Sequence, residues 1–251
     1  MKEYQHTDKQ SSSPKPQFDT VVKQFLSQVS HGIRTPLNSI MGFSKLLLTK
    51  VKDPADQEKY ARRVVESSTS LLRFVECLVD LTQIEAGNKH YKETNCQVNN
   101  LLWELTRDFE DTLMDYQDIQ VQPILVWNSE YKDLEIMTDP VILRKVLDVL
   151  VFDFAAYIGV GIMEIGYTLE AKEERIGFFI RRPHHAPSDT DNRYRGFSFS
   201  EENPLAFRVV TELISLLDGQ FEMPDDFRHG FSFELPLRLP HTHKILEYIK
   251  H

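Results

Sequence analysis

Apolar residues repeat at helical spacing through the first fifty positions of the chain. They follow a 4-3-4-3 alternation with Pro36 in the one missing step, and stand at Val22, Leu26, Val29, Ile33, Ile40, Phe43 and Leu47. This alternation is typical of a coiled-coil seam and predicts a helix over residues 18–52. Pro36 lacks an amide hydrogen, so a bend is expected in the turn that contains Gly32.

A second helix with a wide apolar stripe is predicted over residues 54–86. Asp53 is a suitable cap, Pro54 suits the first turn, and Gly87 is a suitable stop. Two helices with wide stripes cannot cover each other, because a hairpin has only one contact seam. The pattern therefore predicts a homodimeric four-helix bundle built from two hairpins.

From Val98 onward shorter helical and strand patterns alternate. Helices are predicted over 98–116, 139–157 and 204–217, and strands over 119–127, 134–137, 161–169, 175–180, 220–223 and 231–237. The class is α+β, with the helical hairpin followed by an α/β two-layer sandwich. The expected organisation is a disordered tail (1–17), the hairpin (18–87), a linker (88–97), the sandwich (98–240) and a second tail (241–251).

Composition and charge narrow the function classes. The chain has 251 residues, 41% of them hydrophobic, and a formal net charge of −9. An acidic chain argues against nucleic acid or an anionic membrane as the main partner. The cysteines Cys77 and Cys96 show no metal-ligand spacing, and no segment has the apolar length of a membrane span. We expect a cytoplasmic protein without a metal site.

One histidine of the first helix lies on its polar side. If Leu26 and Ile33 occupy a positions of the heptad, His31 falls at f, the position farthest from a partner helix. Thr35 lies one turn further on the same face. A lone histidine on a helix surface is ordinarily a solvated polar residue, so periodicity alone assigns it no role.

The sequence around this histidine, SHGIRTPLNSI, closely resembles the phosphoacceptor box of sensor histidine kinases. Gly32 is the one departure, because the family carries an acidic residue there. The segments TDPVILRKVLDVL, VVTELISLLDGQFEM and HGFSFELPL are similar, in order, to parts of the family's ATPase domain of the Bergerat type. The resemblance covers roughly residues 18–239 and implies a phosphoacceptor at His31. It also implies that Thr35 positions a water. Arg34 is a candidate to steady phosphoryl charge and is equally well read as a structural residue of the bundle surface.

The residues expected to hold ATP depart from the family pattern. Asp148 and Asp153 stand where asparagines are usual, and Asp153 remains a possible ligand for magnesium. The glycine-rich loops are replaced by RRPHHAPSD and SEENPLAF, which lack the backbone freedom needed near phosphate. Gly32 lacks the carboxylate that the resemblance assigns as the general base of autophosphorylation.

The loop between the predicted strand 175–180 and the helix 204–217 is rich in basic residues. They are Arg181, Arg182, His184, His185, Arg193 and Arg195. We read them as a solvated surface rather than a nucleotide grip, since no glycine or helix start organises them. His184 and His185 lack a third ligand, so no metal site is predicted.

These features lead to a functional hypothesis in two-component signalling. The chain is expected to pass a phosphoryl group between His31 and an aspartate of a response-regulator receiver domain, as a homodimer and without ATP-dependent autophosphorylation. ATP and magnesium would be cofactors only if the divergent site still binds them. Two alternatives are an active kinase with a divergent ATP site and a non-enzymatic pseudokinase that binds a partner kinase or regulator. Because few residues precede the phosphoacceptor box, the signal is expected to come from elsewhere or from a region outside this sequence.

Overall fold

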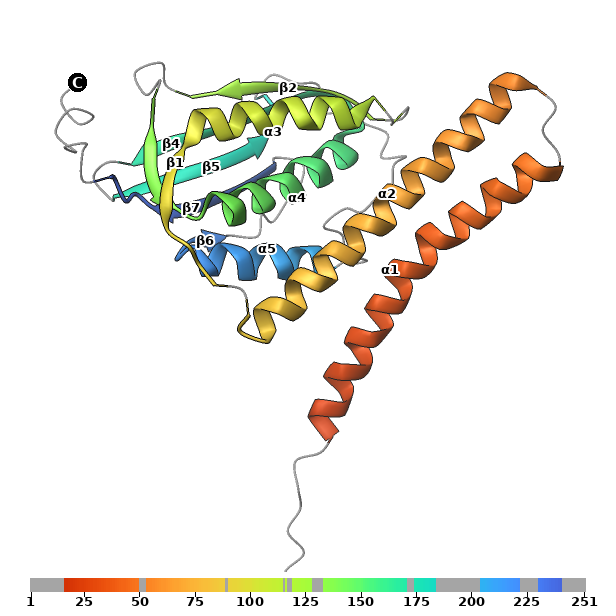
Figure 1. Ribbon diagram of the computed structural model, residues 1–251, viewed down its shortest axis with the longest axis horizontal. Helices are drawn as coiled ribbons and strands as arrows, with labels where there is room; N and C mark the ends of the chain where they lie inside the picture. The colour runs from red at the N-terminus through yellow and green to blue at the C-terminus, as the bar shows by residue number, and fades with distance from the viewer. Residues whose placement is uncertain are drawn as a thin grey trace, which may run out of the picture.

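The chain begins with two long antiparallel helices that form a hairpin (Figure 1). The computed structural model describes residues 16–49, 53–88, 90–114, 116, 119–127, 133–170, 174–183, 204–221 and 230–240. Helix α1 spans Pro16–Thr49 and α2 spans Pro54–Glu85. The predicted helical hairpin is therefore confirmed. Of the predicted tail 1–17, residues 16 and 17 belong to α1, while residues 1–15 and the predicted tail 241–251 lie outside the described residues.

Local sequence explains where α2 begins and how the hairpin packs. The side chain of Asp53 accepts a hydrogen bond from the Ala55 amide, and Pro54 occupies the first turn. Near the connection, the rings of Phe43 and Tyr60 stack with centroids 5.8 Å apart. α1 continues through Pro36, whose side chain is buried.

The remaining elements form an α/β sandwich. They are β1 (Thr94–Gln97), α3 (Val98–Leu113), β2 (Gln120–Val126), β3 (Glu135–Thr138), α4 (Pro140–Ile158), β4 (Val160–Glu170), β5 (Arg175–Arg181), α5 (Pro204–Leu216), β6 (Gln220–Phe221) and β7 (Gly230–Pro236). We call β1 to β7 with their helices the sandwich domain. Each predicted helix and strand has a counterpart here, with ends that differ by at most three residues.

A five-stranded mixed sheet forms one layer of the sandwich domain. Its order is β2-β4-β5-β7-β6, with β2 and β4 parallel and the other pairs antiparallel. The helices α3, α4 and α5 cover one face of this sheet (Figure 1). The predicted α+β class, a helical hairpin followed by a helix-on-sheet domain, is confirmed.

Strand β1 is a feature that the sequence pattern did not predict. Residues 94–97 fall within the predicted linker 88–97, but they pair antiparallel with β3 and bury Cys96. Asp139 ties the preceding segment down, because it caps α4 and also accepts a hydrogen bond from the Lys92 amide at 2.9 Å. The segment is mostly polar and buries only one residue of its strand, so it has no apolar alternation that predicts a strand.

The hydrophobic core of the sandwich domain extends into the hairpin. Phe74, Cys77 and Leu81 of α2 are buried in one cluster with the residues of α3, α4, α5 and the sheet. Helix α5 contacts both α2 and α1. Among the described residues, no helix is long and apolar enough to cross a membrane.

Candidate functional site: an exposed histidine and two carboxyls on α4

His31 lies on α1 with its side chain exposed to solvent, as the heptad register predicts. Arg34 and Thr35 are also exposed, and Thr35 lies one turn further along the same helix. Pro36 cannot donate a hydrogen bond to the Gly32 carbonyl, so the backbone beside His31 lacks one helical hydrogen bond. The three residues thus share one accessible stretch of α1.

Gly32 packs directly against Phe74 of α2. A Cβ atom built at Gly32 would approach three carbons of the Phe74 ring, the farthest of them at only 2.9 Å. The Phe74 ring is almost completely buried. The position beside His31 is therefore closed to any larger side chain, including the acidic residue of the family pattern.

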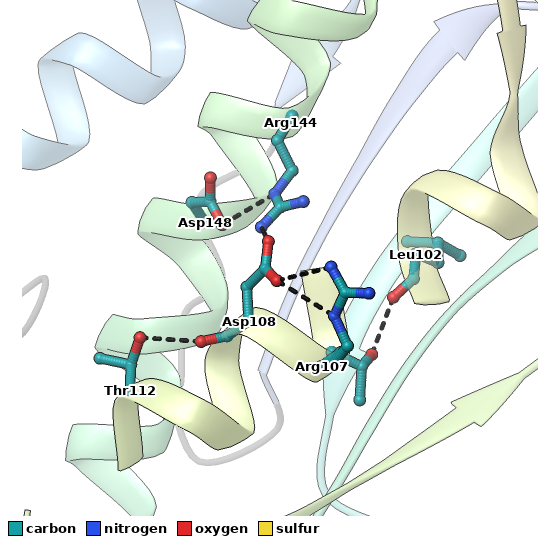
Figure 2. Close-up of polar contacts among 7 residues, drawn as sticks. Leu102, Arg107, Asp108, Thr112, Arg144 and Asp148 are labelled. Atoms are coloured by element: carbon teal, nitrogen blue, oxygen red, sulfur yellow. Dashed lines mark hydrogen bonds and ion pairs between the residues drawn. The ribbon is translucent and has the colours of Figure 1, made fainter. Parts of the chain in front are cut away.

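Asp148 of α4 lies in a network of charged side chains that joins α3 and α4 (Figure 2). Arg144 donates one hydrogen bond from Nε to Asp148 and one from Nη2 to Asp108, both at 3.0 Å. Arg107 binds the same Asp108 carboxylate at 3.2 Å. These hydrogen bonds, with Arg144 as the main donor, lower the pKa of Asp108.

Asp153 lies one and a half turns further along α4 and is 5% exposed. Burial raises its pKa well above the usual range, and the nearby Arg73 of α2 opposes that shift. Among the described residues, no donor forms a hydrogen bond to its Oδ2 atom. The guanidinium carbon of Arg73 lies 3.3 Å from the ring centroid of the neighbouring Phe152.

A cavity of about 290 Å³ connects these groups between α2, α3 and α4. It is lined by the carboxyls Glu76, Asp108, Asp148 and Asp153 and by the cations Arg73, Arg144 and Lys145. A magnesium ion here would face three positive side chains, with one α4 carboxyl bound by Arg144 and the other favouring its neutral form. In this arrangement of the two domains the cavity does not fit a magnesium ion.

Part of the predicted ATP region lies outside the described residues. The structure describes Arg181, Arg182 and Pro183 at the end of β5, and it describes Pro204 at the start of α5. His184, His185, Arg193 and Arg195 fall between them and are not described. Arg181 pairs with Glu164 at 2.9 Å, and no cluster of three metal-type ligands is found among the residues the structure covers.

Three residues of the site escaped the sequence analysis. Arg144 had a detectable signal, because it precedes Asp148 by four residues on a predicted helix. Arg73 and Phe74 gave none, since the partners of both side chains lie far away in the sequence. Only the packing of α2 on α1 and α4 brings them to the site.

The phosphoacceptor part of the chain matches a known domain. The profile of the His Kinase A (phospho-acceptor) domain matches residues 21–87, which include His31 and both helices of the hairpin. This match, together with the relatives described below, supports a sensor histidine kinase family for the chain. His31 lies inside the matched domain, and the sandwich domain follows it along the chain.

Two sensor kinases match most of the chain. It is 26% identical over 238 residues to the sensor histidine kinase GacS of Pseudomonas protegens, which covers 88% of this chain and 25% of GacS. It is 24% identical over 235 residues to the autoinducer 2 sensor kinase/phosphatase LuxQ of Vibrio vulnificus, which covers 85% of this chain and 26% of LuxQ. The chain thus spans about a quarter of the length of these relatives.

A solved structure supports the same fold. The histidine kinase AdeS of Acinetobacter baumannii superposes with a TM-score of 0.56 at 18% identity. The superposition covers 82% of this chain and 98% of that one. The likeness concerns the order and packing of the hairpin and the sandwich domain.

Proposed function

We propose that the chain passes a phosphoryl group between His31 and the aspartate of a response-regulator receiver domain, without phosphorylating itself from ATP. One contrast carries this proposal. The phosphoacceptor-type histidine is exposed on α1, whereas the α4 carboxyls face arginines of the chain itself. The first feature serves phosphotransfer, and the second does not serve nucleotide binding.

The transfer needs little from this chain beyond an accessible imidazole. In its neutral form one ring nitrogen attacks the phosphorus of the receiver's acyl phosphate, and the P–O bond breaks with its electron pair returning to the carboxylate. The receiver supplies the aspartate and its own magnesium. The reverse transfer uses the same groups. Neither direction requires an acidic residue at position 32, because that residue is expected to act as general base only in autophosphorylation from ATP.

Arg34 and Thr35 are the neighbours that can assist. The exposed guanidinium of Arg34 can bind phosphoryl oxygens during the transfer. The hydroxyl of Thr35, one turn from His31, can hold a water near the phosphorylated ring. With glycine at position 32, water activation has no carboxylate base, so hydrolysis of the phosphohistidine is expected to be slow.

The functional unit is proposed to be a homodimer. Large apolar side chains are exposed along the hairpin, at Leu26, Leu37, Met41, Leu48, Val65, Leu72, Val75 and Val79. Two hairpins can bury these stripes in a four-helix bundle. The buried free thiols Cys77 and Cys96 are suited to a reducing compartment such as the cytoplasm.

A labelling experiment with the full chain tests the proposal. Receiver domains phosphorylated with ³²P-acetyl phosphate are mixed with the wild-type chain, His31→Gln and His90→Gln. His90 is a matched control, because it is another exposed histidine outside the phosphoacceptor box. We expect label on the wild type and on His90→Gln, and none on His31→Gln.

A parallel reaction with γ-³²P-ATP and magnesium separates the alternatives. The proposal expects no label on His31 from ATP. Label on His31 from ATP identifies an active kinase with a divergent site. If no receiver labels His31 and the cellular phenotype survives His31→Gln, the chain is a binding-only pseudokinase.

A further inference from the structure

Two adjacent residues of α2 contact different parts of the molecule. Phe74 packs against Gly32, next to His31 on α1. Arg73 lies over the Phe152 ring and interacts with the charge of Asp153, both on α4. One turn of α2 thus contacts both the phosphoacceptor helix and the sandwich domain.

Arg73 is held by desolvated contacts. Its guanidinium lies over the face of Phe152, where cation–π attraction is strongest when water is excluded. Burial lowers its pKa, while Tyr116, Asp153 and Asp148 favour its charged form. An arginine retains its charge under these conditions, so this contact brings a cation to the carboxyls of α4.

Further charge pairs follow the same side of α2. Lys145 of α4 binds Glu76 at 3.5 Å and Asp80 at 3.4 Å. Arg208 of α5 pairs with Glu85 near the end of α2. Arg73, Glu76 and Asp80 follow at spacings of three and four residues, so α2 presents a charged face to α4. Glu85 adds a contact with α5 further along the helix.

We propose that this face is an intramolecular docking surface on which Arg73 is the anchor that fastens the sandwich domain to the phosphoacceptor hairpin. The sandwich domain then acts as a fixed partner of α2 instead of a mobile donor of phosphate. This inference builds on the proposed function, in which the sandwich domain does not deliver ATP to His31. It adds a contact residue and a stable arrangement of the domains.

Interdomain distances test the docking. Nitroxide labels are attached to cysteines introduced at Lys59 on α2 and Glu110 on α3, both exposed and away from the docking surface. The labelled chain is mixed with excess unlabelled chain, so that pulsed electron paramagnetic resonance reads distances within one chain. Arg73→Met removes the anchor charge, and Arg73→Lys keeps the charge but loses the planar stacking.

Arg62→Met is the matched control. It also removes an arginine from α2, but this arginine pairs with Glu58 on the same helix. We expect one narrow distance in the wild type and in Arg62→Met, a broad distribution in Arg73→Met, and an intermediate one in Arg73→Lys. Circular dichroism accompanies each variant, and if Arg73→Met is unfolded, the comparison rests on Arg73→Lys.

If Arg73→Met folds and gives the wild-type distance distribution, the docking proposal is overturned. If Arg73→Met does not fold, a wild-type distribution in Arg73→Lys overturns it. So does a broad distribution in the wild type. Adding magnesium and a non-hydrolysable ATP analogue to the wild type is expected to leave the distance unchanged, and a shift overturns the role of Arg73 as a permanent anchor. None of these measurements uses a receiver, so failure of docking and failure of phosphotransfer remain distinguishable.

Discussion

The residue that follows His31 is the most informative single position in the chain. A glycine inside a helix costs about 0.5–1 kcal/mol relative to alanine. Here the space gained is filled by the buried ring of Phe74. The histidine therefore keeps its exposed position without the neighbouring carboxylate of the family pattern, and the two helices approach closely at this point.

Substitution of Gly32 by alanine is expected to destabilise the hairpin. The added methyl group would collide with the Phe74 ring, and overpacking of this kind lowers the free energy of unfolding by about 1–3 kcal/mol. Gly42→Ala is the control, because nothing lies within 4 Å of a Cβ atom there, and it should gain about 0.5–1 kcal/mol. Urea unfolding of both variants measures the difference. Equal shifts of the same sign would contradict the packing argument.

The buried carboxyl of Asp153 should make stability fall as pH rises. Its pKa is raised in the folded chain by burial, so its contribution to the free energy of unfolding is complete below about pH 4, the pKa of an unfolded aspartate. That contribution is lost as the pH rises from there through the folded pKa. Asp153→Asn should remove this part of the pH dependence, which unfolding curves at several pH values measure.

Asp108→Asn serves as a control of opposite sign. Hydrogen bonds from Arg144 and Arg107 lower the pKa of Asp108, so its contribution is present above about pH 4 and lost as the pH falls. The asparagine variant should therefore lose stability mainly near neutral pH. If both variants give curves parallel to the wild type, neither carboxyl has the pKa shift assigned to it.

At the scale of elements, apolar periodicity predicted both hairpin helices and the main helices and strands of the sandwich domain. It succeeded because those stripes are long and their caps, Asp53 and Asp139, are local in sequence. It missed β1, which is short and buries only one side chain, Cys96. It predicted an exposed His31, but the contacts of Arg73 and Phe74 depend on helix packing and have no local signature.

The exposed stripe of α2 should mediate self-association. Val65, Leu72 and Val79 recur every seven residues and all remain exposed in the single chain. Leu72→Glu places charge in the proposed dimer seam and is expected to raise the dimer dissociation constant at least tenfold, since burying an unpaired charge costs several kcal/mol. Sedimentation equilibrium measures the change.

Gln83→Glu is the control for the dimer experiment. It introduces the same charge at an exposed polar position of the same helix and should leave the association unchanged. If Leu72→Glu associates like the wild type, the exposed stripe is not the dimer seam. A monomeric wild type at micromolar concentration would contradict the four-helix bundle itself.

At the scale of the whole molecule, the hairpin and the sandwich domain share one hydrophobic core. Cys77 of α2 is buried in it beside α4, and burial raises the pKa of its thiol to about 12. Cys96 of β1 is buried within the sandwich domain, and burial raises its pKa to about 11. The two thiols therefore report separately on domain docking and on the integrity of the sandwich domain.

Charge reversal at the docking surface should expose one thiol and not the other. Lys145→Glu turns two attractive contacts, with Glu76 and Asp80, into repulsions. As α2 separates from α4, Cys77 gains solvent and a larger thiolate fraction, so iodoacetamide at pH 8 should modify it at least tenfold faster. Peptide mass spectrometry measures both cysteines, and the rate at Cys96 should stay that of the wild type.

Arg107→Glu, which reverses a charge on α3 that pairs with Asp108, should change neither rate. Equal acceleration at both cysteines would mean that Lys145→Glu unfolds the sandwich domain, and unchanged rates would mean that the charged face of α2 does not hold the domains together.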